Sequence, residues 1–175
     1  EVAGDWLDRL HAAAWSSPDI ANVTPFSNNA TICSYPFEGW TGGVPGTLGL
    51  ARLDRVIARA NARRRVDIPT AVGFCMYIRR DCLSAVGEFD AARFGRGYGE
   101  ENDFCMRAQK AGWRHVLAGD VFVFHAGSVS FSEQRFALQE AATRALLEAH
   151  PDYPQKIHDF LARDPDNVML LMLEE

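Results

Sequence analysis

Three carboxylates, Glu100, Glu101 and Asp103, lie within four consecutive positions directly ahead of an apolar stretch with helical spacing. If a helix begins near Asn102, its free N–H groups and dipole favour nearby anions by about 0.3 to 1 kcal/mol each, so an acidic first turn can be purely structural. This interpretation suits Asp103 better than the adjacent pair Glu100 and Glu101, whose like charges should repel. A glycine-rich loop, 94–99, delivers that pair, as in a site that binds a cation or accepts a proton. Both interpretations stay open on spacing alone.

His125 is the best-placed partner for these carboxylates. It ends an apolar run, 121–124, and small and hydroxylic residues follow it at 127–132, leaving room for a bound group. Imidazole with carboxylates is an ordinary ligand set for Mg²⁺ or Mn²⁺. A single histidine at a strand end is more often structural, and the spacing by itself is weak evidence for a metal.

The composition excludes several classes of protein. The chain has 175 residues, of which 47% are hydrophobic and 23% charged, as in one ordinary globular domain. The formal net charge is -5, and the cluster at 63–65 has no aromatic residues among its arginines, so we expect no nucleic-acid partner. The four cysteines form no C-x-x-C pair, which favours buried free thiols in a reducing compartment over a disulfide framework. Without a signal-peptide pattern or a membrane-length apolar run, we expect a cytoplasmic protein.

Hydrophobic spacing predicts the elements that must position these groups. We expect helices over 5–16, 48–64, 81–87, 102–111, 132–149 and 155–162, and strands over 20–25, 66–78, 113–117 and 121–124. Because short strands alternate with helices, the fold class is α/β with a mixed sheet flanked by helices. The segment 33–46 is expected to be irregular. The aliphatic tail, 168–173, either packs on the body or continues into a missing or partner segment.

Three segments stand in a distinctive order and spacing: Thr-Ala-Val-Gly-Phe-Cys-Met-Tyr-Ile-Arg-Arg at 70–80, Val-Gly-Glu-Phe-Asp at 86–90, and Gly-Tyr-Gly-Glu-Glu-Asn-Asp-Phe-Cys-Met-Arg-Ala at 97–108. Together they resemble the C-terminal, acceptor-side half of family 2 glycosyltransferases, which have the GT-A fold. The resemblance extends from Trp6 to Phe131, and the combined pattern is far more specific than any one segment. It implies a partial GT-A domain, of the nucleotide-diphospho-sugar transferase type, over 1–150. The remainder, 151–175, would be a C-terminal helix and the aliphatic tail.

The resemblance assigns the catalytic and metal-binding roles. Glu101 matches the second acid of the family's Glu-Asp pair, the general base on the acceptor hydroxyl, although Glu in place of Asp moves the carboxylate by one methylene. Glu100 would support the site and orient the acceptor or the base. His125 matches the histidine that completes coordination of a divalent cation, Mg²⁺ or Mn²⁺, on the nucleotide diphosphate.

The resemblance also implies substrate contacts. Gly73, Phe74 and Cys75 would line the sugar pocket. Asp103 matches the acid at the helix start, and we group it with the substrate-binding residues. Its expected role, like that of Arg107, is support from behind the site.

The implied activity is inverting transfer of a sugar from a nucleotide-diphosphate sugar to a hydroxyl of a carbohydrate or lipid-linked acceptor, as in the synthesis of cell-envelope polysaccharides. The segment 107–113 lacks the Gln-x-x-Arg-Trp pattern of processive members, so we expect addition of single sugars. The Asp-x-Asp half should precede Glu1. We therefore expect the chain to be a fragment with little activity alone.

Two rival functions remain. The same fold can serve as a non-catalytic scaffold or interaction module, and Glu100, Glu101 and His125 are also compatible with a metal-dependent phosphoesterase. Homo-oligomer formation and peripheral association of the whole protein with the inner face of a membrane stay open. The donor nucleotide, the sugar and the acceptor cannot be read from the sequence.

Overall fold

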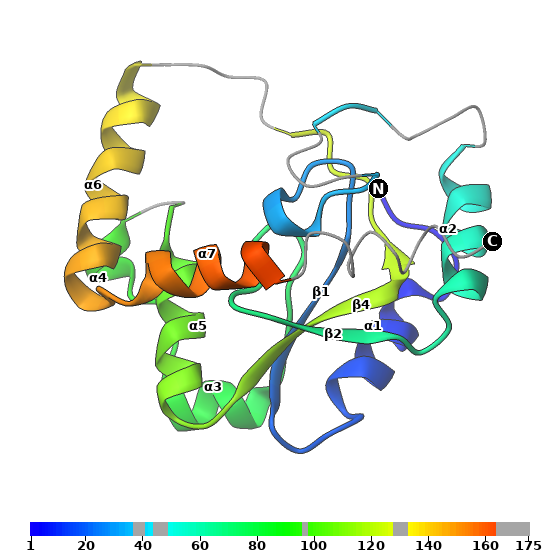
Figure 1. The fold of residues 1–175 in the computed structure, drawn as a ribbon, viewed down its shortest axis with the longest axis horizontal. Helices are drawn as coiled ribbons and strands as arrows, with labels where there is room; N and C mark the ends of the chain where they lie inside the picture. The colour runs from blue at the N-terminus through cyan, green and yellow to red at the C-terminus, as the bar shows by residue number, and fades with distance from the viewer. Residues whose placement is uncertain (37–40, 44–48, 96–97, 128–132, 164–175) are drawn as a thin grey trace.

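The computed structural model describes residues 1–36, 41–43, 49–95, 98–127 and 133–163 (Figure 1). The aliphatic tail at 168–173 and the expected helix start at Ser132 lie outside these residues. Within the described part of the chain, no helix is both long and apolar enough to cross a lipid bilayer.

A mixed sheet lies at the centre of the fold. Its strands are β1 (Ile20–Phe26), β2 (Arg65–Ile68), β3 (Tyr77–Ile78) and β4 (Arg114–Phe122), in the order β2-β4-β1-β3. The two central strands, β1 and β4, run parallel, and each edge strand is antiparallel to its neighbour. The predicted α/β class with a mixed sheet is confirmed at this level.

Helices pack around the sheet. They are α1 (Trp6–Ala14), α2 (Leu50–Ala60), α3 (Arg80–Val86), α4 (Ala91–Phe94), α5 (Glu100–Lys110), α6 (Glu133–Ala149) and α7 (Tyr153–Arg163), with a 3-10 turn η1 (Thr31–Cys33) after β1. In Figure 1, α7 runs from the lower end of α6 back toward the strands, on the side of the molecule where α5 lies.

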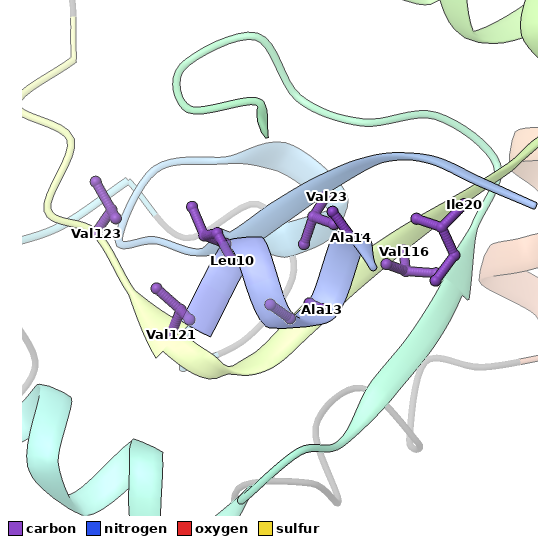
Figure 2. Close-up of a cluster of buried hydrophobic side chains, with 9 residues drawn as sticks. Leu10, Ala13, Ala14, Ile20, Val23, Val116, Val121 and Val123 are labelled. Atoms are coloured by element: carbon purple, nitrogen blue, oxygen red, sulfur yellow. The ribbon is translucent and has the colours of Figure 1, made fainter. Parts of the chain in front are cut away.

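The alternation of side chains along β4 explains how α1 and α2 cover different faces of the sheet. Val116 and Ala118 pack in the cluster that contains Leu10 of α1, whereas Leu117, between them, packs in the cluster that contains Leu53 of α2. Successive residues of a strand point to opposite faces, so the two helices lie on opposite sides. Figure 2 shows the α1 side of this core, whose buried members are all aliphatic side chains, with Trp6, Phe74, Cys75 and Tyr77 packed against them.

Helix α5 begins two residues earlier than predicted, at Glu100. Gly99 is the residue before the first turn and has φ +83°, a conformation that glycine adopts without a side-chain penalty. The sharp turn there lets the helix start at once and places both glutamates in its first turn. As the spacing predicts, Phe104 and Ala108 form the buried face.

The predicted strand at 66–78 is wrong, because the structure divides it into β2 and β3. These strands pair with different partners at opposite edges of the sheet, so the chain between them must cross the ends of the two central strands. Pro69 lacks the N–H that a continuous ladder would require. The crossing segment, 69–76, becomes part of the candidate site.

The two predicted strands at 113–117 and 121–124 are one strand, β4. The Ala-Gly-Asp sequence at 118–120 resembles a turn, but Gly119 donates a backbone hydrogen bond to the Arg64 carbonyl at 3.1 Å. The Asp120 carboxylate accepts a hydrogen bond from the Arg65 side chain at 2.8 Å. These contacts keep the segment extended.

Candidate active site

The first turn of α5 presents one of its two adjacent glutamates to a cavity of about 530 Å³. Glu101 lines this cavity, whereas Glu100 does not. One carboxylate oxygen of Glu100, Oε2, is buried and has no hydrogen-bond partner among the described residues. The adjacent acids therefore occupy different environments.

The cavity is built from five parts of the chain. Its walls come from η1, from the start of the crossing segment 69–76, from the α5 start, and from α6 and α7. The lining residues are Thr31, Ile32, Thr70, Ala71, Val72, Tyr98, Gly99, Glu101, Asn102, Gln139, Ala142, Thr143, Leu146, Leu147, Tyr153, Ile157 and Leu161.

Burial raises the pKa of Glu101 above the ordinary value for a glutamate, and the negative charge of Glu100 raises it further. Removal from water penalises the carboxylate form, and a neighbouring like charge does the same. A carboxylate with a raised pKa is a stronger base than a solvent-exposed one. Glu101 is therefore suited to accept a proton from a group bound in the cavity.

At Gly73 the crossing segment lies directly against this carboxylate. A Cβ built on Gly73 would stand 3.5 Å from Cγ of Glu101, so even a methyl group here would contact the base. Upstream, the amide of Val72 donates to Oγ1 of Thr24 at 3.1 Å, which ties the segment to β1. The structure thus brings Gly73 and Glu101 together.

None of the three predicted sugar-pocket residues, Gly73, Phe74 and Cys75, is among the residues that line the cavity. The Phe74 ring stacks on His125, with centroids 5.4 Å apart and planes at 19°. Cys75 packs against the core cluster beneath α1, and burial raises the pKa of its thiol.

His125 lies beyond Phe74 and is not among the residues that line the cavity with Glu101. Nδ1 of its ring lies 2.8 Å from the Asn29 carbonyl, which can only accept, so Nδ1 carries a proton and Nε2 is the nitrogen left for a ligand. Asn28 also holds the His125 backbone, accepting from its amide at 2.8 Å and donating to its carbonyl at 3.0 Å.

A histidine ring fixed through one nitrogen is how metal-binding histidines are usually oriented, so His125 fits the role of a single ligand. Among the described residues, no group of three or more histidine, cysteine, aspartate or glutamate side chains could hold a metal ion together. The metal role of His125 stays a prediction.

Asp103 is buried, and both of its carboxylate oxygens have partners within the protein. Arg107 donates from Nε to Oδ2 at 2.8 Å, and His150 lies with Nε2 2.8 Å from Oδ1. Burial alone would raise the pKa of Asp103, but the hydrogen bonds from His150 and Arg107 outweigh it and hold that pKa below its usual value. A buried carboxylate that is paired within the protein is compatible with the expected supporting role. Substrate contact by Asp103 stays a prediction.

The cavity residues of α6 and α7 were not predicted from the sequence. They include Tyr153, which the expected domain limits place beyond the catalytic part. The only available signal was the spacing of Ala142 and Leu146, four residues apart on α6, which also fits any helix that packs on a core.

No protein-family profile matches this chain, and no curated protein matches it either.

Proposed function

We propose that the chain is the acceptor-side part of an inverting glycosyltransferase with a GT-A fold, similar to family 2. The observation that carries the proposal is the position of Glu101, a partly buried carboxylate of raised pKa at the wall of a cavity. The order of the three motifs supports the same function. The mixed sheet with flanking helices is compatible with it.

The chemistry needs a base at this position. An alcohol hydroxyl has a pKa far above 7 and is a poor nucleophile until a carboxylate within hydrogen-bond reach accepts its proton. Glu101 takes that proton while the alcohol oxygen bonds to the anomeric carbon. The bond from that carbon to the leaving nucleoside diphosphate breaks, and its electron pair goes to the diphosphate. Attack opposite the leaving group inverts the anomeric configuration.

The neighbours of Glu101 have supporting roles in this scheme. The charge of Glu100 contributes to the raised pKa of the base, and Gly73 lies directly against the Glu101 side chain. A divalent cation, Mg²⁺ or Mn²⁺, would stabilise the charge that develops on the leaving diphosphate. On this chain His125 would hold it through Nε2.

The test is a screen of nucleotide sugars against simple acceptors with the intact protein, followed by NMR of the product to read its anomeric configuration. Transfer with inversion supports the proposal. Retention of configuration contradicts the single-base mechanism. If no donor is either hydrolysed or used for transfer, the result would favour the non-catalytic scaffold.

A further inference from the structure

Most of the side chains that α6 and α7 contribute to the cavity wall are apolar, although Gln139 and Thr143 of α6 also line it. Five side chains form this surface, here called the apolar wall: Ala142, Leu146, Leu147, Ile157 and Leu161. Leu146 is 4% exposed, whereas Leu147 lines the cavity and is 38% exposed. A ligand bound beside Glu101 must therefore also meet hydrocarbon.

Polar groups gather at the other end of the same cavity. Tyr153, the first residue of α7, forms a side-chain hydrogen bond with Thr70, and both line the cavity with Glu101. Burial raises the pKa of the Tyr153 phenol, and the charge of Glu101 raises it further. Glu101, Thr70 and Tyr153 form the polar end of the cavity.

The two surfaces are fixed relative to each other by contacts between α5 and the corner that joins α6 to α7. His150 at that corner is 3% exposed and hydrogen-bonds to Asp103, two residues after Glu101. On α7, Lys156 donates to Gln109 of α5 at 3.1 Å. The apolar wall is therefore a built part of the site.

We propose that the cavity binds an amphipathic acceptor, with its hydroxyl at the polar end and an alkyl or aromatic group against the apolar wall. This inference rests on the proposed function and names its acceptor class. A free sugar has hydroxyls on every side, and those facing the apolar wall would lose their hydrogen bonds to water without replacement. An alkyl or aromatic group gains free energy when the same surface covers it.

The test uses this chain with two probes that share one sugar. Binding of n-octyl β-D-glucopyranoside, kept below its micelle concentration, is compared with binding of methyl β-D-glucopyranoside by NMR titration. Each methylene that the apolar wall covers is worth about fourfold in affinity. We expect the octyl glucoside to bind at least about tenfold more tightly. Equal affinity, or binding of neither probe, overturns the inference.

Variants on one helix test where the alkyl group lies. Leu147→Gln on the apolar wall should weaken octyl glucoside binding by about fivefold or more. Leu138→Gln is the matched control, because Leu138 is also on α6 and is 57% exposed but does not line the cavity. Equal weakening by both variants would mean that the detergent binds the outer helix surface, and would overturn the inference. Ile157→Thr, on α7, repeats the test should Leu147→Gln fold poorly.

A further variant tests the polar end. Tyr153→Phe removes one hydroxyl from it and should weaken both glucosides by a similar factor. Octyl glucoside binding with no transferase activity in the intact protein would contradict the function and leave the amphipathic site standing.

Discussion

Burial acts on Glu101 and His115 in the same physical way but with opposite chemical results. In both cases it disfavours the charged form. For Glu101 this raises the pKa and makes a better base, at a cavity that a substrate can enter. For His115, which is 1% exposed in the core, it lowers the pKa from 6.5 to about 4 and keeps the ring neutral.

Glu100→Gln should change the pH dependence of transfer. The base works only when it is ionised, so the rate falls as the pH drops through the raised pKa of Glu101. Burial is the larger cause of that raised pKa and the charge of Glu100 the smaller, so the variant should move the acid limb of the kcat/KM profile partway toward lower pH. An acid limb that stays in place or moves to higher pH would contradict the assigned roles.

His115 should make the fold sensitive to mild acid. Its Nε2 donates to the Cys105 carbonyl at 2.9 Å, and Nδ1 is buried without a partner among the described residues. The unfolded chain takes up a proton at this residue near pH 6.5 and the folded chain only near pH 4. The free energy of unfolding therefore falls as the pH drops between these values, by up to about 3 kcal/mol.

The measurement for His115 is urea unfolding at several pH values, with His115→Gln as the comparison. The variant lacks the titrating ring and should lose about 3 kcal/mol less than the wild type between pH 6.5 and 4. NMR titration of the His115 ring supplies an independent check. Protonation near pH 6.5 in the folded protein would show that the ring is not buried as described.

At the scale of elements, the corner between α6 and α7 depends on a buried polar contact to α5. Asp103 and His150 lie there with side chains 4% exposed each, and Nζ of Lys110 lies 3.0 Å from Nδ1 of the same ring. The C-terminal end of α6 and the start of α7 meet at His150. The contact between His150 and Asp103 therefore determines where Tyr153 lies. The shape of the cavity thus depends on a group that does not line it.

Asp103→Asn should lower the free energy of unfolding by about 3 kcal/mol, because it leaves Arg107 and His150 with an uncharged partner in a buried position. Chemical denaturation measures this change. Glu140→Gln is the control, since its ion pair with Arg144 on α6 has side chains 77% and 69% exposed and should matter by less than about 0.5 kcal/mol. Equal effects of the two variants would rule out a special role for the buried contact.

Sequence spacing predicted the elements whose signals are local. The apolar faces of α1, α2 and α5 recur every three to four residues, and the structure contains all three helices. Prediction failed where contacts with residues distant in the sequence determine the backbone conformation. The turn-like residues at 118–120 remain in β4 because Arg64 and Arg65 pair with them, and α4 is only four residues long, too short for a periodic signal.

The candidate site was predictable to a similar extent. Adjacent acids after a glycine loop indicated the start of α5 to within two residues, and Gly73 within an apolar run indicated a close approach, which the structure has at the Glu101 side chain. The apolar wall could not be predicted. Its side chains come from helices some forty to sixty residues downstream, and only the packing at Asp103 and His150 brings them to Glu101.

At the scale of the whole molecule, two sets of contacts anchor the helices around the sheet. The first set joins α1, α2 and β4, because Arg9 of α1 pairs with Asp54 of α2 at 2.7 Å and donates to the Asp120 carbonyl of β4. The second set joins α5 to the hairpin of α6 and α7. The crossing segment 69–76 connects β2 to β3, which lie at opposite edges of the sheet, and it brings Gly73 against the Glu101 side chain. The site therefore lies where the sheet, α5 and the helical hairpin meet.

The central claim is that Glu101 accepts the proton of the acceptor hydroxyl, and the most direct measurement is the transfer rate of Glu101→Gln in the intact protein at saturating donor. The amide has nearly the same shape but cannot take the proton. We predict a loss of about 10²- to 10⁴-fold in kcat, with the dissociation constant of the donor unchanged. A variant that transfers sugar within about threefold of the wild-type rate would contradict this assignment.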